Sequence, residues 1–231
     1  MQLDFKAREL TVKLVYYGPA LSGKTTNLQA IHRLVDPDAT GRLMTLETRD
    51  DRTLFFDLLP LTFNSGNGPQ VRIKLFTVPG QVMHNATRRL VLQSADGVAF
   101  IADSQKAETR ANQVAFRNML ENLRENGMDP PSVPKVVQFN KRDLPDIRSD
   151  EEIDRLAEKS DEPVFKAVAL RGTGVMETFM GLMTQVWLNL EKTHSLEQKF
   201  GLQPDVFLEE IRTRLSSKKA DGSGTNQGEA P

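Results

Sequence analysis

The sequence of 231 residues contains no cysteine. Disulfides, thiolate nucleophiles and thiolate metal sites are therefore excluded. No apolar run approaches the ~20 residues of a transmembrane helix, and the first residues, MQLDFKAREL, lack the apolar core of a secretory signal. An excess of charge of either sign is also missing, because 30 basic and 31 acidic residues give a formal net charge of -1. That balance gives no support to a nucleic-acid partner.

The lack of cysteine also bears on attachment to membranes. Prenyl and palmitoyl anchors require cysteine, and residue 2 is Gln2 where myristoylation requires glycine. We therefore expect a cytoplasmic protein with no lipid anchor of its own, which only a partner would bring to a membrane.

Strand-like and helix-like segments alternate along the chain, which is typical of an α/β domain. Gly66, Gly68 and Pro69 separate the second strand-like segment from the third by a turn, which predicts a hairpin and one antiparallel strand. The predicted fold is a mostly parallel sheet of about six strands flanked by helices. The predicted strands are 11–17, 53–61, 71–78, 97–102, 135–139 and 163–169, and the predicted helices are 25–34, 106–125, 149–158 and 174–192.

The last of these helices carries a stripe of methionines, Met176, Met180 and Met183, together with Phe179 and Trp187. Methionine-rich stripes serve in some proteins as adaptable partner surfaces. Helical spacing of apolar residues more commonly marks the face that packs on a sheet, and we favour that interpretation.

The character of the chain changes after His194. Pro204 is suited to the first turn of a helix, and from Ser216 onward the chain is small and polar, which predicts disorder. We divide the chain into a domain at 1–193, a helical extension at 194–215 and a disordered tail at 216–231. The extension either docks a partner or folds back on its own domain, because periodicity does not say against what a face is buried. Its apolar residues at helical spacing are Phe207, Leu208, Ile211 and Leu215.

Residues 18–25 match the phosphate-binding pattern G-x-x-x-x-G-K-[ST] and lie between a predicted strand and a predicted helix. Successive backbone N–H groups of such a loop surround a β-phosphate at the positive end of the helix. Lys24 supplies a cation between the β- and γ-phosphates and is a candidate catalytic residue, and the Thr25 hydroxyl is a candidate Mg²⁺ ligand. The predicted phosphate-binding residues are Gly18, Pro19, Ala20, Leu21, Ser22, Gly23, Lys24, Thr25 and Thr26.

A second motif indicates which nucleotide base the site binds. Asn140, Lys141 and Asp143 form N-K-R-D directly after the predicted strand 135–139. The carboxylate can accept from both the ring N–H and the exocyclic amine of guanine, and adenine leaves that acceptor unpaired. Both motifs follow strand ends, where open parallel sheets hold their ligands. The pair predicts a site for GTP and GDP.

The third motif, TVPGQ at 77–81, carries a family resemblance. Ras-like GTPases have D-x-x-G followed by glutamine at this point. With threonine in place of the aspartate, the motif resembles that of the bacterial gliding-motility MglA family. The resemblance extends over roughly residues 5–192 and implies a P-loop NTPase of Ras-like fold. Other segments that resemble this family are YYGP at 16–19, DRTLFFDLLPL at 51–61, ADSQ at 102–105 and NKRDLP at 140–145.

The resemblance implies roles for five further residues. Thr53 would contact Mg²⁺ and the γ-phosphate in the GTP state, and Gly80 would sense the γ-phosphate through its backbone N–H. Gln81 would orient the attacking water, and Arg52 would act as an internal arginine finger. The backbone N–H of Ala169 would reach the guanine carbonyl oxygen. Without the resemblance, Arg52 is more typical of a solvated charge.

The resemblance also implies an activity and partners. Members of the family hydrolyse GTP slowly and are accelerated by a small Roadblock-type protein, MglB. They act as molecular switches in cell polarity and motility. We therefore expect an MglB-like activating protein, unidentified effectors, and recruitment to cell poles by partners.

Two departures from the usual pattern affect these expectations. Thr77 removes the carboxylate that usually steadies the hydration shell of Mg²⁺, and we hypothesise that Asp57 supplies it instead. Direct ligands would remain Thr25, Thr53, phosphate oxygens and water. Ala20 stands where Ras-like proteins generally have glycine, with its methyl group toward the reacting centre, so we expect slow intrinsic hydrolysis.

Two rival functions stay open. A nucleotide-gated scaffold that binds GTP but scarcely hydrolyses it is favoured by Ala20 and Thr77. An ATP-using P-loop kinase or ATPase fits residues 18–25 but leaves N-K-R-D without a purpose.

Overall fold

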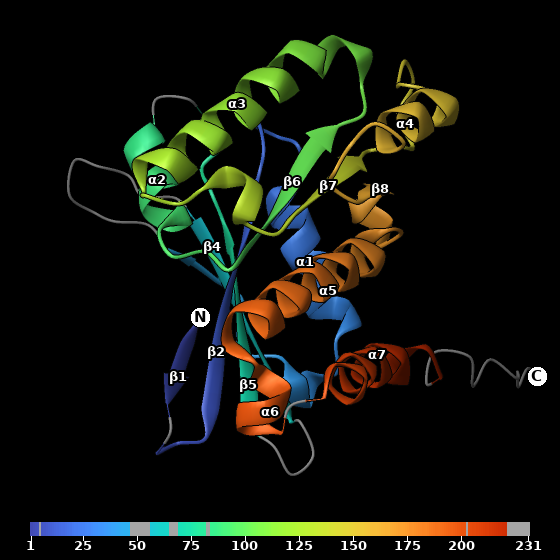
Figure 1. Cartoon of the computed structure of the whole chain (residues 1–231). Helices are drawn as coiled ribbons and strands as arrows, with labels where there is room; N and C mark the ends of the chain where they lie inside the picture. Colours follow the sequence, from blue (N-terminus) through green and yellow to red (C-terminus); the bar gives the residue numbers. More distant parts are fainter. Residues whose placement is uncertain (5, 47–55, 65–68, 82–83, 202, 221–231) are drawn as a thin grey trace, which may run out of the picture.

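The computed structural model describes residues 1–4, 6–46, 56–64, 69–81, 84–201 and 203–220 (Figure 1). Within them an eight-stranded sheet has the order β3-β4-β5-β2-β6-β7-β8, and β1 pairs with β2. The strands that pair in parallel are β5, β2, β6, β7 and β8. The bounds of the strands are β1 Gln2–Asp4, β2 Glu9–Tyr17, β3 Met44–Leu46, β4 Phe56–Asn64, β5 Gln70–Thr77, β6 Gly97–Asp103, β7 Lys135–Asn140 and β8 Val164–Lys166.

The mostly parallel α/β sheet is confirmed, and the strand count needs correction. Each of the six predicted strands has a counterpart, and β4 and β5 form the predicted antiparallel hairpin. The sequence did not predict β1 and β3, which are 3 residues each and pair antiparallel with β2 and β4. Strands this short are too brief to show a period of two.

The helices cover both faces of the sheet. The predicted helix at 106–125 is a 3₁₀ turn followed by α3, and α4 begins at a capping box formed by Ser149 and Glu152. Neither α2 nor α6 was predicted from the sequence. The helices are α1 Lys24–Leu34, α2 Asn85–Leu92, α3 Thr109–Glu125, α4 Asp150–Ala157, α5 Val175–His194, α6 Leu196–Phe200 and α7 Pro204–Ala220, with 3₁₀ turns η1 Pro37–Ala39, η3 Lys106–Glu108, η4 Pro130–Ser132 and η5 Ala169–Arg171.

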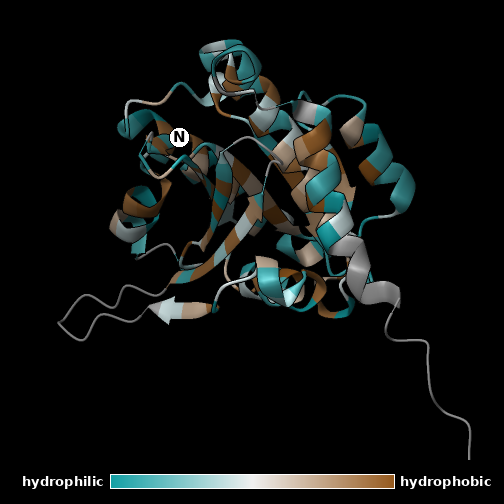
Figure 2. Ribbon diagram, turned by 90° about the horizontal axis from the view of Figure 1, so that it is seen from below, coloured by the Kyte–Doolittle hydropathy of each residue, from teal (hydrophilic) through white to brown (hydrophobic). Residues whose placement is uncertain are grey.

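Two apolar layers follow from the alternation of side chains along β2. Leu14 and Tyr16 belong to the core beneath α1 and α5, whereas Val15 and Tyr17 belong to the core beneath α2 and α3. Hydrophobic residues accordingly run along the strands, and the outer faces of the helices are largely hydrophilic (Figure 2).

The methionine stripe of α5 faces the core beneath α1 and α5. Phe179, Met183 and Trp187 are buried, and the flanking Met176 and Met180 are partly buried against the same cluster. The core interpretation of the stripe is thus confirmed.

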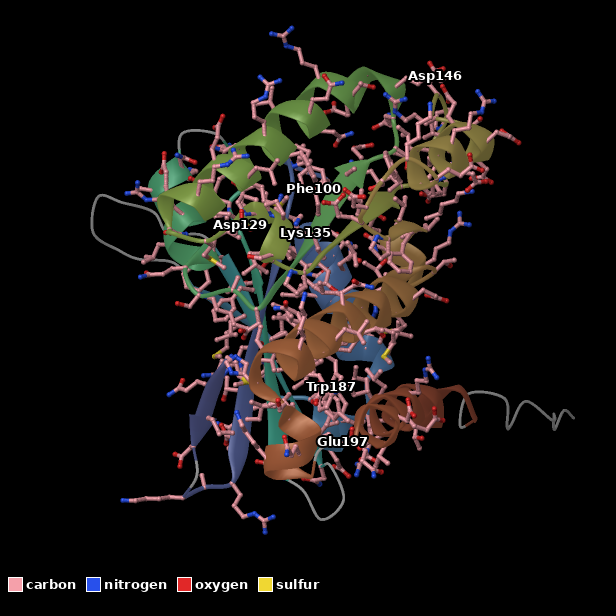
Figure 3. All side chains as sticks on the ribbon, in the orientation of Figure 1. Phe100, Asp129, Lys135, Asp146, Trp187 and Glu197 are labelled. Atoms are coloured by element: carbon pink, nitrogen blue, oxygen red, sulfur yellow. The ribbon has the colours of Figure 1, made fainter. Side chains whose placement is uncertain are left out.

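The C-terminal extension folds back on its own domain, which was one of the two alternatives. Helix α7 packs against α5 and β4, and Phe207 and Ile211 are fully buried in the same cluster as the sheet residues. Trp187, labelled in Figure 3, lies on α5 beside α7. The centroid of its ring is 4.8 Å from that of Phe207. Further along α7, the Arg214 carbonyl accepts a hydrogen bond from the Asp36 N–H at 3.1 Å.

The boundary of the tail also needs correction. Helix α7 continues to Ala220, past Ser216, where we expected disorder to begin, and the rest of the predicted tail lies outside the described residues. The polar composition after Ser216 concealed the helix, because it has no apolar spacing. None of the helices in the described ranges combines the length and the apolar character that a membrane span requires.

Candidate functional site

The predicted motifs meet at the carboxyl edge of the parallel strands, because β2, β5 and β7 all end there. A cavity of about 640 Å³ is lined by the phosphate loop, Asp57 and residues 77–81. A smaller cavity of about 230 Å³ is lined by Asn140, Lys141, Asp143, Leu144 and residues 168–170. Leu21, Gly23 and Thr26 line both cavities, so the two adjoin across the phosphate loop.

Close packing of the phosphate loop explains Gly23, the residue before α1. Its φ of +96° lies in the left-handed region, and a Cβ added there would stand 2.2 Å from Asn140 Nδ2. Glycine at this position therefore lets the loop lie directly against the residue that begins N-K-R-D.

Lys24 places a cation inside the loop. Its side chain is 7% exposed, and Nζ donates to the carbonyls of Gly18 at 3.1 Å and Pro19 at 2.6 Å. Burial, chiefly, and the nearby charge of Arg88 together lower the pKa of Lys24 to about 7, and the charge of Asp57 opposes the shift. The Lys24 ammonium favours an anion in the cavity, because an opposite charge stabilises its charged form.

The smaller cavity is built around Asn140. Its Nδ2 donates to the Ser22 carbonyl at 2.8 Å, and its Oδ1 accepts from the Ala169 N–H at 2.9 Å. Asn140 therefore ties the phosphate loop to the 168–170 loop. The N–H that we expected to face a guanine carbonyl thus has a protein partner in this structure, so its contact with guanine stays a prediction.

Lys141 and Asp143 of N-K-R-D also line this cavity. Lys141 adopts a left-handed backbone with φ of 65°, and its Nζ donates to Asp103 Oδ2 at 2.6 Å. Asp143 lies 3.9 Å from the Arg171 guanidinium, between Oδ2 and Nη2.

The loop at 77–81 lies against the phosphate loop. A Cβ added at Gly80 would stand 2.4 Å from Ala20 Cα and 2.8 Å from Ala20 N, so only glycine fits. Gln81 lines the larger cavity, and so does His84. The predicted switch and arginine-finger residues, Thr53 and Arg52, lie outside the described residues.

No family model matches the chain. Over 190 residues the chain is 43% identical to the mutual gliding-motility protein MglA of Myxococcus xanthus (strain DK1622), and the alignment covers 82% of this chain and 97% of that protein. The chain belongs to the MglA family of Ras-like small GTPases. Its mostly parallel sheet flanked by helices is consistent with the Ras-like fold of this family.

In this MglA-family chain, Asp57 lies beside the threonine that replaces the usual aspartate. Thr77 Oγ1 donates to Asp57 Oδ2 at 2.9 Å and accepts from the Asp57 N–H at 2.8 Å. Thr25 Oγ1 donates to the same carboxylate oxygen at 2.6 Å, and Thr45 Oγ1 donates to Oδ1 at 2.9 Å. The Asp57 carboxylate thus reaches the Thr25 hydroxyl of α1 from strand β4, which pairs with the strand β5 that carries Thr77.

These oxygens suit Mg²⁺, which prefers hard oxygen ligands. Asp57 is 5% exposed, and its three hydroxyl donors orient both of its oxygens. Because the Asp57 carboxylate lies within hydrogen-bond distance of Thr25, a candidate Mg²⁺ ligand, it is placed to accept hydrogen bonds from the waters around the ion.

Three contacts at the candidate site of this MglA-family chain were not predicted from the sequence. Asp103 holds Lys141, Thr45 holds Asp57, and Arg88 contacts the 77–81 loop. Asp103 ends strand β6, and an acidic residue at that edge is a signal that could have revealed it. Thr45 and Arg88 carry no comparable signal, because only the folded chain brings them to the site.

Proposed function

We propose that the protein is a small GTPase that switches between GTP-bound and GDP-bound states and slowly hydrolyses GTP to GDP and phosphate. The observation that carries the proposal is the joining of the phosphate loop to the base motif by Asn140. The relative in Myxococcus xanthus is a gliding-motility protein, and we assign this chain to regulation of motility or cell polarity.

The phosphates are held by residues 18–26. Backbone N–H groups of the loop face the β-phosphate, and Lys24 exchanges its bonds to the Gly18 and Pro19 carbonyls for bonds to phosphate oxygens. Thr25 and Thr53 would hold Mg²⁺, with Asp57 bonded to its waters. When bound, the ion neutralises charge on the phosphates.

Guanine occupies the smaller cavity. Asp143 accepts from the ring N–H and the exocyclic amine, and the Lys141 stem packs on the base while its ammonium is held by Asp103. Ala169 would contribute its N–H to the guanine carbonyl by exchanging its bond to Asn140 Oδ1. An adenine base would leave the Asp143 carboxylate unpaired, which gives the site its specificity.

Hydrolysis depends on the residues around the γ-phosphate. Gln81 orients the attacking water, Gly80 donates its N–H to the γ-phosphate, and Arg52 stabilises the developing charge. A Roadblock-type, MglB-like protein accelerates the step, and effectors bind the GTP state.

A second candidate, the nucleotide-gated scaffold, is favoured by the close approach of Ala20 to Gly80. A Cβ added at Gly80 would stand 3.1 Å from the Ala20 methyl, so this methyl occupies space beside the loop that carries Gln81. Crowding of the attacking water would leave binding intact and slow the reaction.

Single-turnover hydrolysis of GTP with Mg²⁺ tests the proposal, with and without a Roadblock-type protein from the same genome. We expect slow hydrolysis that the partner accelerates, and displacement of labelled GTP by GDP but not by ATP. Binding without turnover in both conditions would establish the scaffold instead. Displacement by ATP as effective as by GDP would contradict both candidates.

Replacement of Asp57 by asparagine is expected to weaken the Mg²⁺ dependence of GTP affinity. The neutral amide keeps the size of the side chain but loses the charge that the Thr25, Thr45 and Thr77 hydroxyls orient. Changes in the partners of metal ligands typically cost about 10-fold to 100-fold in metal affinity. Titration of Mg²⁺ against nucleotide release measures it, and an unchanged midpoint would contradict the role.

A further inference from the structure

Arg88 of α2 is a buried cation with a defined set of partners. Its side chain is 1% exposed, Nε donates to the Pro79 carbonyl at 2.8 Å, and Nη2 donates to the Gly80 carbonyl. On its other side Nη1 donates to Asn118 Oδ1 at 2.9 Å, and the guanidinium lies 5.5 Å from the centre of the Tyr17 ring.

A charge in this position is costly. Buried guanidinium groups are usually paired with carboxylates, because an uncompensated charge in a low-dielectric interior is expensive. Within the described ranges the acceptors that Arg88 contacts are two backbone carbonyls and one side-chain amide. A neutral side chain would fill the same space at lower cost, so the guanidinium is better explained by the two carbonyls it holds than by packing.

Those two carbonyls belong to the peptide units on either side of Gly80. In a trans peptide the N–H points opposite to the preceding carbonyl. The bond to the Pro79 carbonyl therefore turns the Gly80 N–H away from the guanidinium, and the bond to the Gly80 carbonyl fixes the next peptide unit. Gly80 also lines the larger cavity and contacts Ala20 of the phosphate loop.

The guanidinium is itself anchored to rigid elements. Asn118 of α3 accepts from the Tyr17 hydroxyl at 2.6 Å and donates to Asn85 at 2.9 Å. Asn122 donates to the Tyr17 hydroxyl at 3.1 Å and to Asn85 at 2.8 Å. Arg88 thus connects the loop around Gly80 to β2 and α3, neither of which belongs to that loop.

We propose that Arg88 is a positioning residue that presets both peptide units of Gly80, and so sets the preference of the site for GTP over GDP. The inference rests on the proposed nucleotide switch. Without the guanidinium the Gly80 N–H loses its fixed direction, and the γ-phosphate must order it on binding. GDP has no γ-phosphate, so its affinity does not depend on this order.

The test compares affinities for GDP and for a non-hydrolysable GTP analogue with Mg²⁺ in the full chain. Arg88→Gln removes the charge and one of the two carbonyl bonds, and Arg88→Lys keeps the charge but cannot hold two carbonyls in one plane. We expect the analogue to bind roughly 10-fold to 100-fold more weakly to Arg88→Gln, which is the effect of losing hydrogen bonds from a charged group. GDP affinity should change less than about threefold, and Arg88→Lys should be intermediate.

Tyr17→Phe is the matched control. It removes a hydroxyl from the same network and leaves the two carbonyl bonds in place, so thermal stability should fall while the ratio of the two affinities stays constant. Equal loss of both affinities in Arg88→Gln, or an unchanged ratio, would assign Arg88 to structure alone. If Arg88→Gln does not fold, an unchanged ratio in Arg88→Lys overturns the inference. Failure of the unaltered protein to bind either nucleotide would refute the proposed function instead.

Discussion

Replacing Gly80 with alanine is expected to slow GTP hydrolysis by roughly 100-fold, because even a displacement of about 1 Å at a reacting centre has an effect of this size. The added methyl group would stand 2.4 Å from Ala20 Cα and 2.8 Å from Ala20 N, which are backbone atoms. Backbone cannot rotate aside as a side chain can, so either the 77–81 loop or the phosphate loop must shift. Single-turnover hydrolysis measures the effect.

A second substitution in the same protein sharpens this experiment. Ala20→Gly removes only the Ala20 methyl group, which lies 3.1 Å from the added Cβ, and leaves the two closer backbone contacts. The double variant should therefore be slower than Ala20→Gly by the same factor as Gly80→Ala is slower than the unaltered protein. A much smaller factor in the Ala20→Gly background would show that the side chain, and not the backbone, causes the conflict.

Replacing Phe207 with alanine is expected to lower the free energy of unfolding by about 3–5 kcal/mol, the usual cost of removing a buried aromatic ring. Phe207 is fully buried, and its ring lies 4.8 Å from that of Trp187. For a chain of this size, each kcal/mol lowers the melting temperature by about 2–4 °C. Denaturant unfolding gives the free energy directly.

Val206 provides the control from the neighbouring position. Its side chain is 49% exposed, so Val206→Ala should cost less than about 0.5 kcal/mol. If Phe207→Ala is as mild as Val206→Ala, then α7 contributes nothing to the stability of the domain. The expected difference would make the extension part of the folded unit.

The sequence predicted best where chemistry restricts the choice of residues. The phosphate loop and N-K-R-D lie at the sheet edge where they were expected, and Asp57 contacts both Thr25 and Thr77. A loop that surrounds phosphate needs a particular order of glycine, lysine and threonine, and such an order is visible in one sequence.

Contacts between distant segments were not predictable in this way. Arg88 and Asn118 are 30 positions apart, and nothing in α2 shows that a cation there holds the 77–81 loop. Strand β3 was missed because it is short, and α2 because its first residues are polar. The surface against which α7 packs could not be predicted, because an apolar face has the same spacing whatever covers it.

The contact between Trp187 and Phe207 has a practical consequence. Trp187 is the only tryptophan in the chain, and it lies buried where α5 meets α7. Its fluorescence therefore reports on one location, the seam between the domain and its extension. A nucleotide or partner protein that lifts α7 would expose the indole to water and shift its emission to longer wavelength, with no label attached. One that acts only at the phosphate loop would leave the spectrum unchanged.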